Sequence, residues 1–269
     1  MDTAKAAERA ALRTAELIAS AGDGSLPVNA SRWTVGELGA HLTATLTTYT
    51  RAVTGSYDAI APYIPVTGTF AERLSALTEE SLALEPERAP QALADAIAKA
   101  SAAYARAAGG RSSSEVIGTP WYGPRARLPL TTASSLLLAE QLVHGADLAT
   151  TLGRPWPIDT GEALLTLPAI ETLLMVLVDR DAVAAHTAGY LVQVDDGPQL
   201  GVRCDKGRLS IEIAPYSSPD CQFVLTMPDL LMVVYGRVGL EELLADGRAH
   251  ASGRRPDLAA GFQHLFLNP

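Results

Sequence analysis

The chain has 269 residues, which at about 150 residues per domain predicts two domains. Hydrophobic residues make up 48% and charged residues 19%, a composition that indicates neither a disordered chain nor a coiled coil. The 21 Lys and Arg residues against 30 Asp and Glu residues give a net charge of −9, which argues against binding to phosphate backbones. We therefore expect no nucleic acid partner.

The sequence also argues against a membrane protein and an exported one. Pro168 and Glu171 interrupt the most apolar stretch, residues 163–178, which falls short of the roughly 20 residues that a spanning helix needs. The first 18 residues alternate charges with alanines and lack the apolar core of a signal peptide. The only cysteines, Cys204 and Cys221, lack CxxC spacing, which excludes a disulfide scaffold and a cysteine-rich zinc site. We expect a cytoplasmic protein.

The first half of the chain has apolar residues at the spacings of helices. Helices are expected over residues 11–20, 38–53, 70–84, 90–107 and 132–150. Thr34 to Glu37 has the form of a capping box, and Trp33 and Leu38 are placed to form a hydrophobic staple around it. His41 then shares the apolar face of this helix, so we expect that histidine to point inward.

Residues 111–130 mix serines, glycines and prolines with Trp121 and Tyr122, which predicts an irregular connection over one end of the helices and beside a pocket. Long helices joined by such connections predict an antiparallel four-helix bundle.

Beyond another helical segment at residues 161–178, the apolar period changes from near 3.6 to near 2. Strands are expected over residues 191–194, 200–204, 209–213 and 222–225, and helices over residues 228–235 and 256–266. Asp205-Lys206-Gly207 between two strands predicts a hairpin turn. We therefore predict an all-α bundle over residues 1–180 followed by an α+β domain over residues 181–269.

One set of polar residues points to a metal. Glu140 and His144 are four residues apart in one predicted helix, so their side chains lie on the same face. His41 supplies a third ligand if its helix is a neighbour in the bundle. Two imidazole nitrogens and one carboxylate oxygen suit Zn²⁺ with one open position, and nickel or iron also fit. Asp147, three residues after His144, is placed to orient a ligand.

The same residues are also compatible with a core that holds no metal. An inward histidine is often a hydrogen-bonded core residue, and Glu140 with His144 can form a buried ion pair. Asp147 is equally consistent with a solvated residue near a helix end. The spacing leaves these alternatives open, and it assigns no role to the three remaining histidines, His186, His250 and His264.

Two segments resemble a known family. Residues 33–42, WTVGELGAHL, and residues 140–148, EQLVHGADL, resemble the mycothiol-dependent maleylpyruvate isomerase family, a branch of the DinB-like metalloenzymes. The resemblance implies a DinB-like bundle in which His41, Glu140 and His144 bind a divalent metal, usually zinc. Residues 230–247 resemble the family's C-terminal domain of sterol carrier type, and Arg237 is the best match to an arginine that this domain places near the active site.

The resemblance implies an enzyme that uses mycothiol, a small thiol, as the fourth ligand of the metal. Because the family has many branches, we rank transfer of the thiol to a small electrophile above cis-trans isomerisation of maleylpyruvate. Arg237 would hold a carboxylate or stabilise a developing enolate. Exchange of one thiol for another is a further possibility, and a non-catalytic protein that binds a small molecule or lipid is the alternative of a different class.

Overall fold

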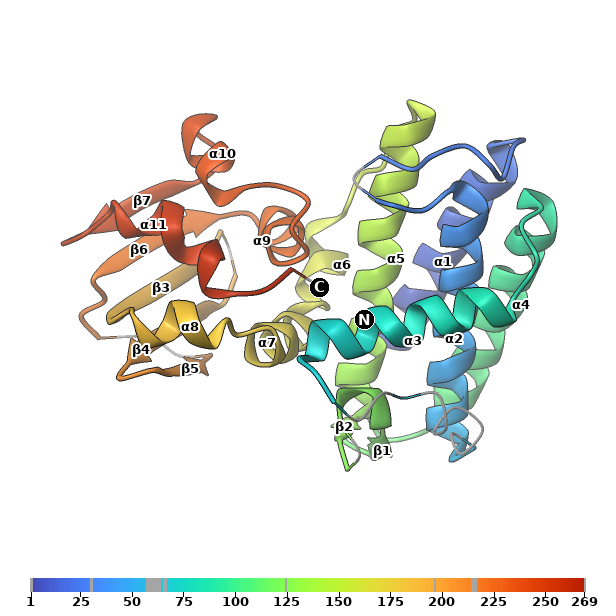
Figure 1. The fold of residues 1–269 in the computed structure, drawn as a ribbon, viewed down its shortest axis with the longest axis horizontal. Helices are drawn as coiled ribbons and strands as arrows, with labels where there is room; N and C mark the ends of the chain where they lie inside the picture. The colour runs from blue at the N-terminus through green and yellow to red at the C-terminus, as the bar shows by residue number, and fades with distance from the viewer. Residues whose placement is uncertain are drawn as a thin grey trace. The chain divides into compact units, whose positions relative to one another are not determined.

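The computed structural model describes residues 2–29, 31–56, 64, 67–123, 125–195, 197–213 and 217–268 (Figure 1). The chain separates into two compact units, Met1–Ile158 and Asp159–Pro269. The first unit is built mainly of helices, and the second combines a five-stranded sheet with short helices. The predicted order of a helical domain followed by an α+β domain is therefore confirmed.

Four long helices pack together in the first unit, and a fifth runs across them (Figure 1). They are α1 (Thr3–Ser20), α2 (Val35–Thr54), α4 (Pro90–Ala108) and α5 (Leu130–Leu152), crossed by α3 (Phe70–Leu84). The buried face of α1 is largely alanine, and these small side chains let α4 and α5 approach closely. Residues 132–139 of α5 are all buried, so α5 lies at the centre of this unit.

The first unit differs from the prediction at two places. Helix α1 begins at Thr3 rather than near residue 11, because the Asp2 side chain accepts a hydrogen bond from the Ala4 N–H and caps the helix. The stretch predicted to be irregular contains a two-stranded antiparallel sheet of β1 (Val116–Gly118) and β2 (Arg127–Pro129). A 3₁₀ turn, η3 (Pro120–Tyr122), lies between these strands.

The sheet of the second unit has the strand order β5-β4-β3-β6-β7, with β3 and β6 parallel and the other neighbours antiparallel. The strands are β3 (Ala188–Val194), β4 (Gln199–Asp205), β5 (Arg208–Glu212), β6 (Cys221–Leu225) and β7 (His250–Gly253). The helices are α6 (Thr160–Leu164), α7 (Leu167–Val176), α8 (Arg180–Ala184), α9 (Met227–Val234), α10 (Leu240–Ala245), α11 (Leu258–Gly261) and η4 (Phe262–Leu265). Six of the seven residues of β3 are buried, as expected for a central strand.

The predicted hairpin between β4 and β5 is confirmed, with Lys206 and Gly207 at φ values of 50° and 77°. Other predictions in this unit were wrong. The helix expected over residues 161–178 is two helices, α6 and α7, and the one expected over residues 256–266 is the short α11 followed by η4. The edge strand β7 was not predicted.

The compact units also divide the chain earlier than the predicted boundary at residue 180. Residues 159–180 belong to the second unit, because α6 and α7 pack against α9 of that unit. The apolar faces of α6 and α7 are thus buried within the α+β unit rather than in the helical bundle.

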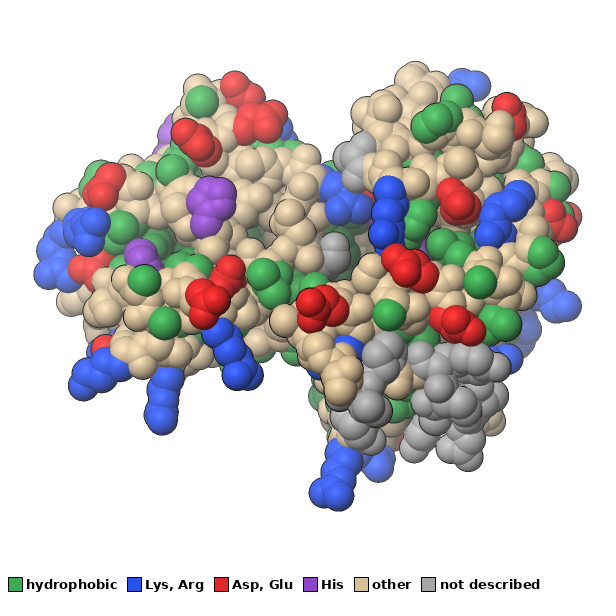
Figure 2. All heavy atoms as spheres, in the orientation of Figure 1, with side chains coloured by type: hydrophobic (Ala, Val, Ile, Leu, Met, Phe, Trp, Pro, Cys, Tyr) green, Lys and Arg blue, Asp and Glu red, His purple; other side chains and the backbone are tan. Residues whose placement is uncertain are grey.

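Within the described ranges, no helix is both long enough and apolar enough to cross a membrane. On the face shown in Figure 2, acidic and basic side chains are interspersed over both units.

Candidate metal centre

Helix α2 carries the first of the three predicted ligands. Its start is set by the predicted capping box, in which the Thr34 hydroxyl accepts from the Glu37 N–H at 3.3 Å and the Glu37 carboxylate accepts from the Thr34 N–H at 2.8 Å. With this start, Leu38 and Leu42 are fully buried, and His41 lies between them in sequence, facing α5. The side chain of His41 is 13% exposed.

Helix α5 carries the other two ligands. The Glu140 Oε2 lies 3.3 Å from the His41 Nε2 and 3.4 Å from the His144 Nε2. The candidate donor atoms of the three residues all lie within 4.8 Å of one another. The side chain of His144 is 8% exposed and that of Glu140 is 23% exposed, so the cluster is open to solvent on the glutamate side. The structure thus brings together the three residues that the sequence singled out.

Asp147 contacts the ring nitrogen of His144 that does not face Glu140. The Asp147 Oδ2 lies 3.1 Å from the His144 Nδ1, and the aspartate side chain is only 3% exposed. In the neutral tautomer whose Nδ1–H donates a hydrogen bond to this carboxylate, Nε2 carries no proton and its lone pair is available to a cation. The orienting role considered for Asp147 fits this geometry better than a solvated position near the helix end.

Trp33 forms one wall of the cluster. Its ring centroid lies 4.7 Å from that of His41 and 5.9 Å from that of His144, and the two imidazoles meet edge to face at 5.4 Å. The sequence predicted only a staple for Trp33. The sequence signal for its contact with the two histidines was its position just before the capping box. The chain turns back at this point, where the Val28 N–H donates a hydrogen bond to the Trp33 carbonyl at 2.9 Å.

The charges of the cluster depend on one another. Burial disfavours the charged form of Glu140, but hydrogen bonds from His144 and His41 outweigh it and hold the pKa of that carboxyl well below its ordinary value. Burial lowers the pKa of His41 more than Glu140 raises it. Burial also lowers the pKa of His144, but the carboxylates of Asp147 and Glu140 have the larger effect, so the pKa of His144 lies above its ordinary value. Two carboxylates in a largely buried site require positive charge nearby.

The remaining predicted site residues lie elsewhere. Trp121 is buried on η3 and packs edge to face against Tyr49 of α2, with ring centroids 5.0 Å apart. Arg237 lies in the second unit, just after α9, and its Nη1 donates to the Tyr235 carbonyl at 2.7 Å. The catalytic role of Arg237 stays a prediction.

Among solved structures, one likeness is to a histidine-to-alanine mutant of the mycothiol-dependent maleylpyruvate isomerase. The identity is 14%, the match covers 93% of this chain and 91% of that one, and the TM-score is 0.50. This likeness concerns the fold alone. A second structure of the mycothiol-dependent maleylpyruvate isomerase matches at 17% identity over 88% of this chain and 87% of that one, with a TM-score of 0.46.

Weaker likenesses are to a sec-alkylsulfatase, Pisa1 from Pseudomonas sp., and to sterol carrier protein 2 like 2 from Aedes aegypti. The first has 18% identity over 51% of this chain and a TM-score of 0.35, and this chain spans only 25% of its length. The second has 17% identity over 36% of this chain and 96% of that one, with a TM-score of 0.28. No curated protein matches the chain.

The sequence profile described as the mycothiol maleylpyruvate isomerase N-terminal domain matches residues 4–149. This range includes all three residues of the cluster and more than half of the chain. The resemblance seen in the two sequence segments is therefore confirmed, and the chain belongs to the mycothiol maleylpyruvate isomerase N-terminal domain family.

Proposed function

We propose that this chain is a metal-dependent enzyme that uses mycothiol on a small electrophilic substrate, with His41, Glu140 and His144 as the metal ligands. One observation carries the proposal: donor atoms from two helices converge within 4.8 Å of one another, and one of the side chains that carry them, Glu140, is 23% exposed. Three protein ligands with access to solvent are typical of a catalytic metal, whereas structural sites are closed by four.

The donor set suits a divalent cation of the zinc type. Two imidazole nitrogens and one carboxylate oxygen are ligands that Zn²⁺ accepts, and nickel or iron also bind such sets. A cation would supply the positive charge that the carboxylates of Glu140 and Asp147 require. The hydrogen bond from His144 to Asp147 supports this assignment, since metal-binding histidines usually donate their second ring N–H to such an acceptor.

A bound divalent cation lowers the pKa of a thiol that it coordinates and holds the sulfur as a thiolate. The residues of the chain prepare the site for this chemistry. Asp147 fixes the ring of His144, so its Nε2 needs no reorientation, and Trp33 covers both imidazoles on one side. The side chain of Glu140 is 23% exposed, and we infer that small molecules reach the cluster from that side.

Two reactions start from such a thiolate and a conjugated electrophile. In isomerisation the thiol leaves again after rotation about the former double bond, and in transfer it stays on the product. The family name supports isomerisation ahead of the thiol transfer that the breadth of the family had favoured. The two are told apart by whether mycothiol is consumed.

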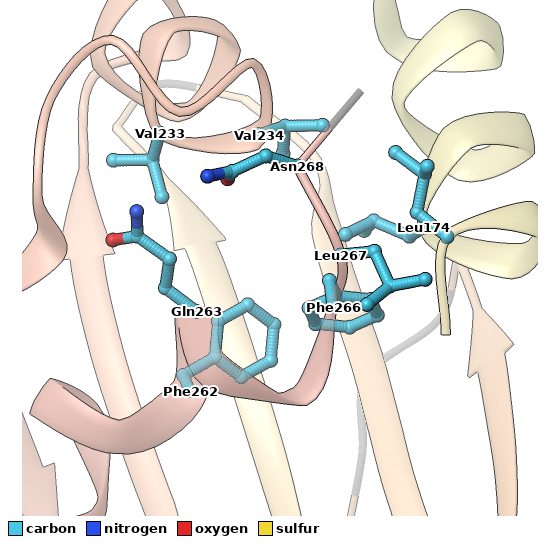
Figure 3. A pocket seen from close by; sticks show the side chains of 9 residues that line it. Leu174, Val233, Val234, Phe262, Gln263, Phe266, Leu267 and Asn268 are labelled. Atoms are coloured by element: carbon cyan, nitrogen blue, oxygen red, sulfur yellow. The ribbon is translucent and has the colours of Figure 1, made fainter. Parts of the chain in front are cut away.

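A lipid-binding protein would need a cavity large enough for a lipid tail. The pocket shown in Figure 3 lies within the second unit. Its lining is mostly apolar and includes Leu174, Leu177, Phe262, Phe266 and Leu267. Its volume of about 20 Å³ has room for one water and not for a lipid tail. This pocket gives the lipid-binding alternative no support.

Metal analysis of the purified protein and of two variants tests the ligand assignment. We expect one metal ion per chain in the parent protein and in His264→Ala, because His264 is exposed in the second unit. His41→Ala should lose the metal. Full metal content in His41→Ala would overturn the assignment.

Turnover tests the enzymatic part of the proposal. The metal-loaded protein is mixed with mycothiol and a set of electrophiles that includes maleylpyruvate. We expect isomerisation without thiol loss, or thiol consumption matched by product. A protein that holds stoichiometric metal yet shows neither reaction with any member of the set would contradict an enzymatic role.

A further inference from the structure

The two histidines of the candidate metal centre are held by different neighbours. The ring of His144 is fixed through Nδ1, which lies 3.1 Å from the buried carboxylate of Asp147. Among the residues that the structure describes, the His41 ring has one hydrogen-bond partner, Glu140, and that contact is made by Nε2. This contact cannot orient the ring for a metal, because the same two residues would then bind the metal through these atoms. A preformed site therefore needs a second contact at His41.

Trp33 supplies this second contact. Its ring centroid lies 4.7 Å from that of His41 at an interplanar angle of 35°, a separation at which aromatic pairs attract each other. The ring of His144 contacts both, with its centroid 5.4 Å from that of His41 and 5.9 Å from that of Trp33. Turning the His41 ring would therefore break its contact with one of the two other rings.

Backbone hydrogen bonds fix the position of Trp33 itself. Its carbonyl accepts from the Val28 N–H at 2.9 Å, and its N–H donates to the Ser31 hydroxyl at 3.1 Å. Two residues later, the Val35 N–H donates to the Leu26 carbonyl at 2.9 Å, which ties together the chain on the two sides of this turn. The backbone of Trp33 is thus set by the turn that leads into α2 and does not depend on a metal.

A ligand that is already in place makes a metal bind more tightly. Immobilising a free side chain on binding costs about 3- to 10-fold in affinity, and a ring that its neighbours hold beforehand avoids this loss. Trp33 is partly exposed, whereas Leu38 and Leu42 of α2 are fully buried. Filling the core therefore does not by itself account for an indole at this position.

We propose that Trp33 is a positioning residue that holds the ring of His41 in its metal-binding orientation. The inference rests on the proposed function, because it concerns one ligand of the proposed metal. It gives the two histidines separate supports: contact with an indole holds the ring of His41, and a hydrogen bond to Asp147 holds that of His144.

The zinc affinity of Trp33 variants provides the first test. The metal-free protein competes for zinc with a chromophoric chelator, at a temperature at which thermal unfolding shows every variant to be folded. Trp33→Leu removes the aromatic ring and should weaken zinc binding about 3- to 10-fold. Trp33→Phe keeps a ring beside His41 and should stay within about twofold of the parent protein. A residue that only packs the start of α2 would change the unfolding temperature and leave this affinity unchanged.

Trp121→Leu is the matched control. It makes the same chemical change in the same unit, where Trp121 packs edge to face against Tyr49 of α2 with ring centroids 5.0 Å apart. Trp121 is 4% exposed, so this variant should lose stability. Within the described ranges its ring contacts are to tyrosines and to neither histidine of the cluster, so its zinc affinity should equal that of the parent protein.

Nuclear Overhauser effects provide a second test that needs no Trp33 variant. With ring centroids 4.7 Å apart, protons of the Trp33 indole and the His41 ring are close enough to give such effects. The spectrum of His41→Ala identifies the His41 signals. We expect the effects in the metal-free protein, and the same pattern in the zinc-loaded protein, because the ring is already in its binding orientation. Where Trp33→Leu fails to fold, this pattern decides.

The outcomes separate this inference from the proposed function. Zinc binding that Trp33→Leu leaves unchanged overturns the inference alone, and so does a His41 ring that contacts Trp33 only after zinc is added. A parent protein that binds no zinc contradicts both the ligand assignment and the inference. Weaker zinc binding in Trp33→Leu, in a protein with no mycothiol-dependent turnover, supports the inference and contradicts the enzymatic role.

Discussion

Replacing Asp147 by Asn should weaken metal binding without unfolding the protein. The carboxylate of Asp147 lies 3.1 Å from the His144 Nδ1 and is 3% exposed, so its charge acts on the imidazole with little screening. Asn has the same shape and keeps one oxygen acceptor, but it lacks the charge that makes the ring a better ligand. Loss of such a partner costs about 10- to 100-fold in metal affinity, which is about 1.4 to 2.7 kcal/mol.

Competition against a chromophoric zinc chelator measures this affinity. Asp159→Asn makes the same chemical change at a helix cap in the second unit, where Asp159 accepts from the Glu162 N–H, and should leave the affinity as it was. Thermal unfolding of both variants shows that each is folded at the assay temperature. An Asp147→Asn protein that binds zinc as tightly as the parent protein would refute the role given to this carboxylate, and so would an equal loss in Asp159→Asn.

Two further predictions concern packing and the thiols. A Cβ on Gly145 would lie 2.0 Å from the Trp156 ring, so Gly145→Ala must displace that ring and should lower the free energy of unfolding in urea by about 1 to 3 kcal/mol. Gly261→Ala, which meets open space, should change it by well under 1 kcal/mol. Burial raises the pKa of Cys204 and of Cys221 to about 11 from an ordinary value of 9.0. Because the folded state holds these protons more tightly than the unfolded chain, their contribution to the free energy of unfolding is fully present below pH 9 and is lost as the pH rises through 11. At pH 8.5 iodoacetamide should therefore label neither thiol in the native protein while it labels the urea-unfolded chain, and rapid native labelling would show that the burial is wrong.

The cluster of His41, Glu140 and His144 could be predicted because its determinants are local. A capping box sets where α2 starts, and that start decides that His41 lies on the inner face. A four-residue spacing places Glu140 and His144 side by side whatever the rest of the fold does. What the spacing could not show was that α2 and α5 are neighbours, and there the resemblance to a family supplied the missing long-range information.

The elements of the fold that were missed depend on contacts between distant segments. Strands β1 and β2 have three residues each, too few for an alternating pattern, and they are strands only because they pair with each other. Their pairing carries Trp121 into the core beside Tyr49. Strand β7, His-Ala-Ser-Gly, likewise has no apolar alternation and is a strand because β6 offers it an edge.

The boundary between the units shows the same limit of sequence patterns. Apolar periodicity in α7 correctly indicates that Ile170, Leu173 and Leu174 are buried. It does not indicate which surface buries them, since a stripe of Leu and Ile packs equally well against a bundle or against a sheet with its helices. Proximity along the chain favoured the bundle, whereas α7 packs against α9 and β5, which come more than 30 residues later. A boundary that falls within a run of helices can therefore be placed only when the partner of each apolar face is known.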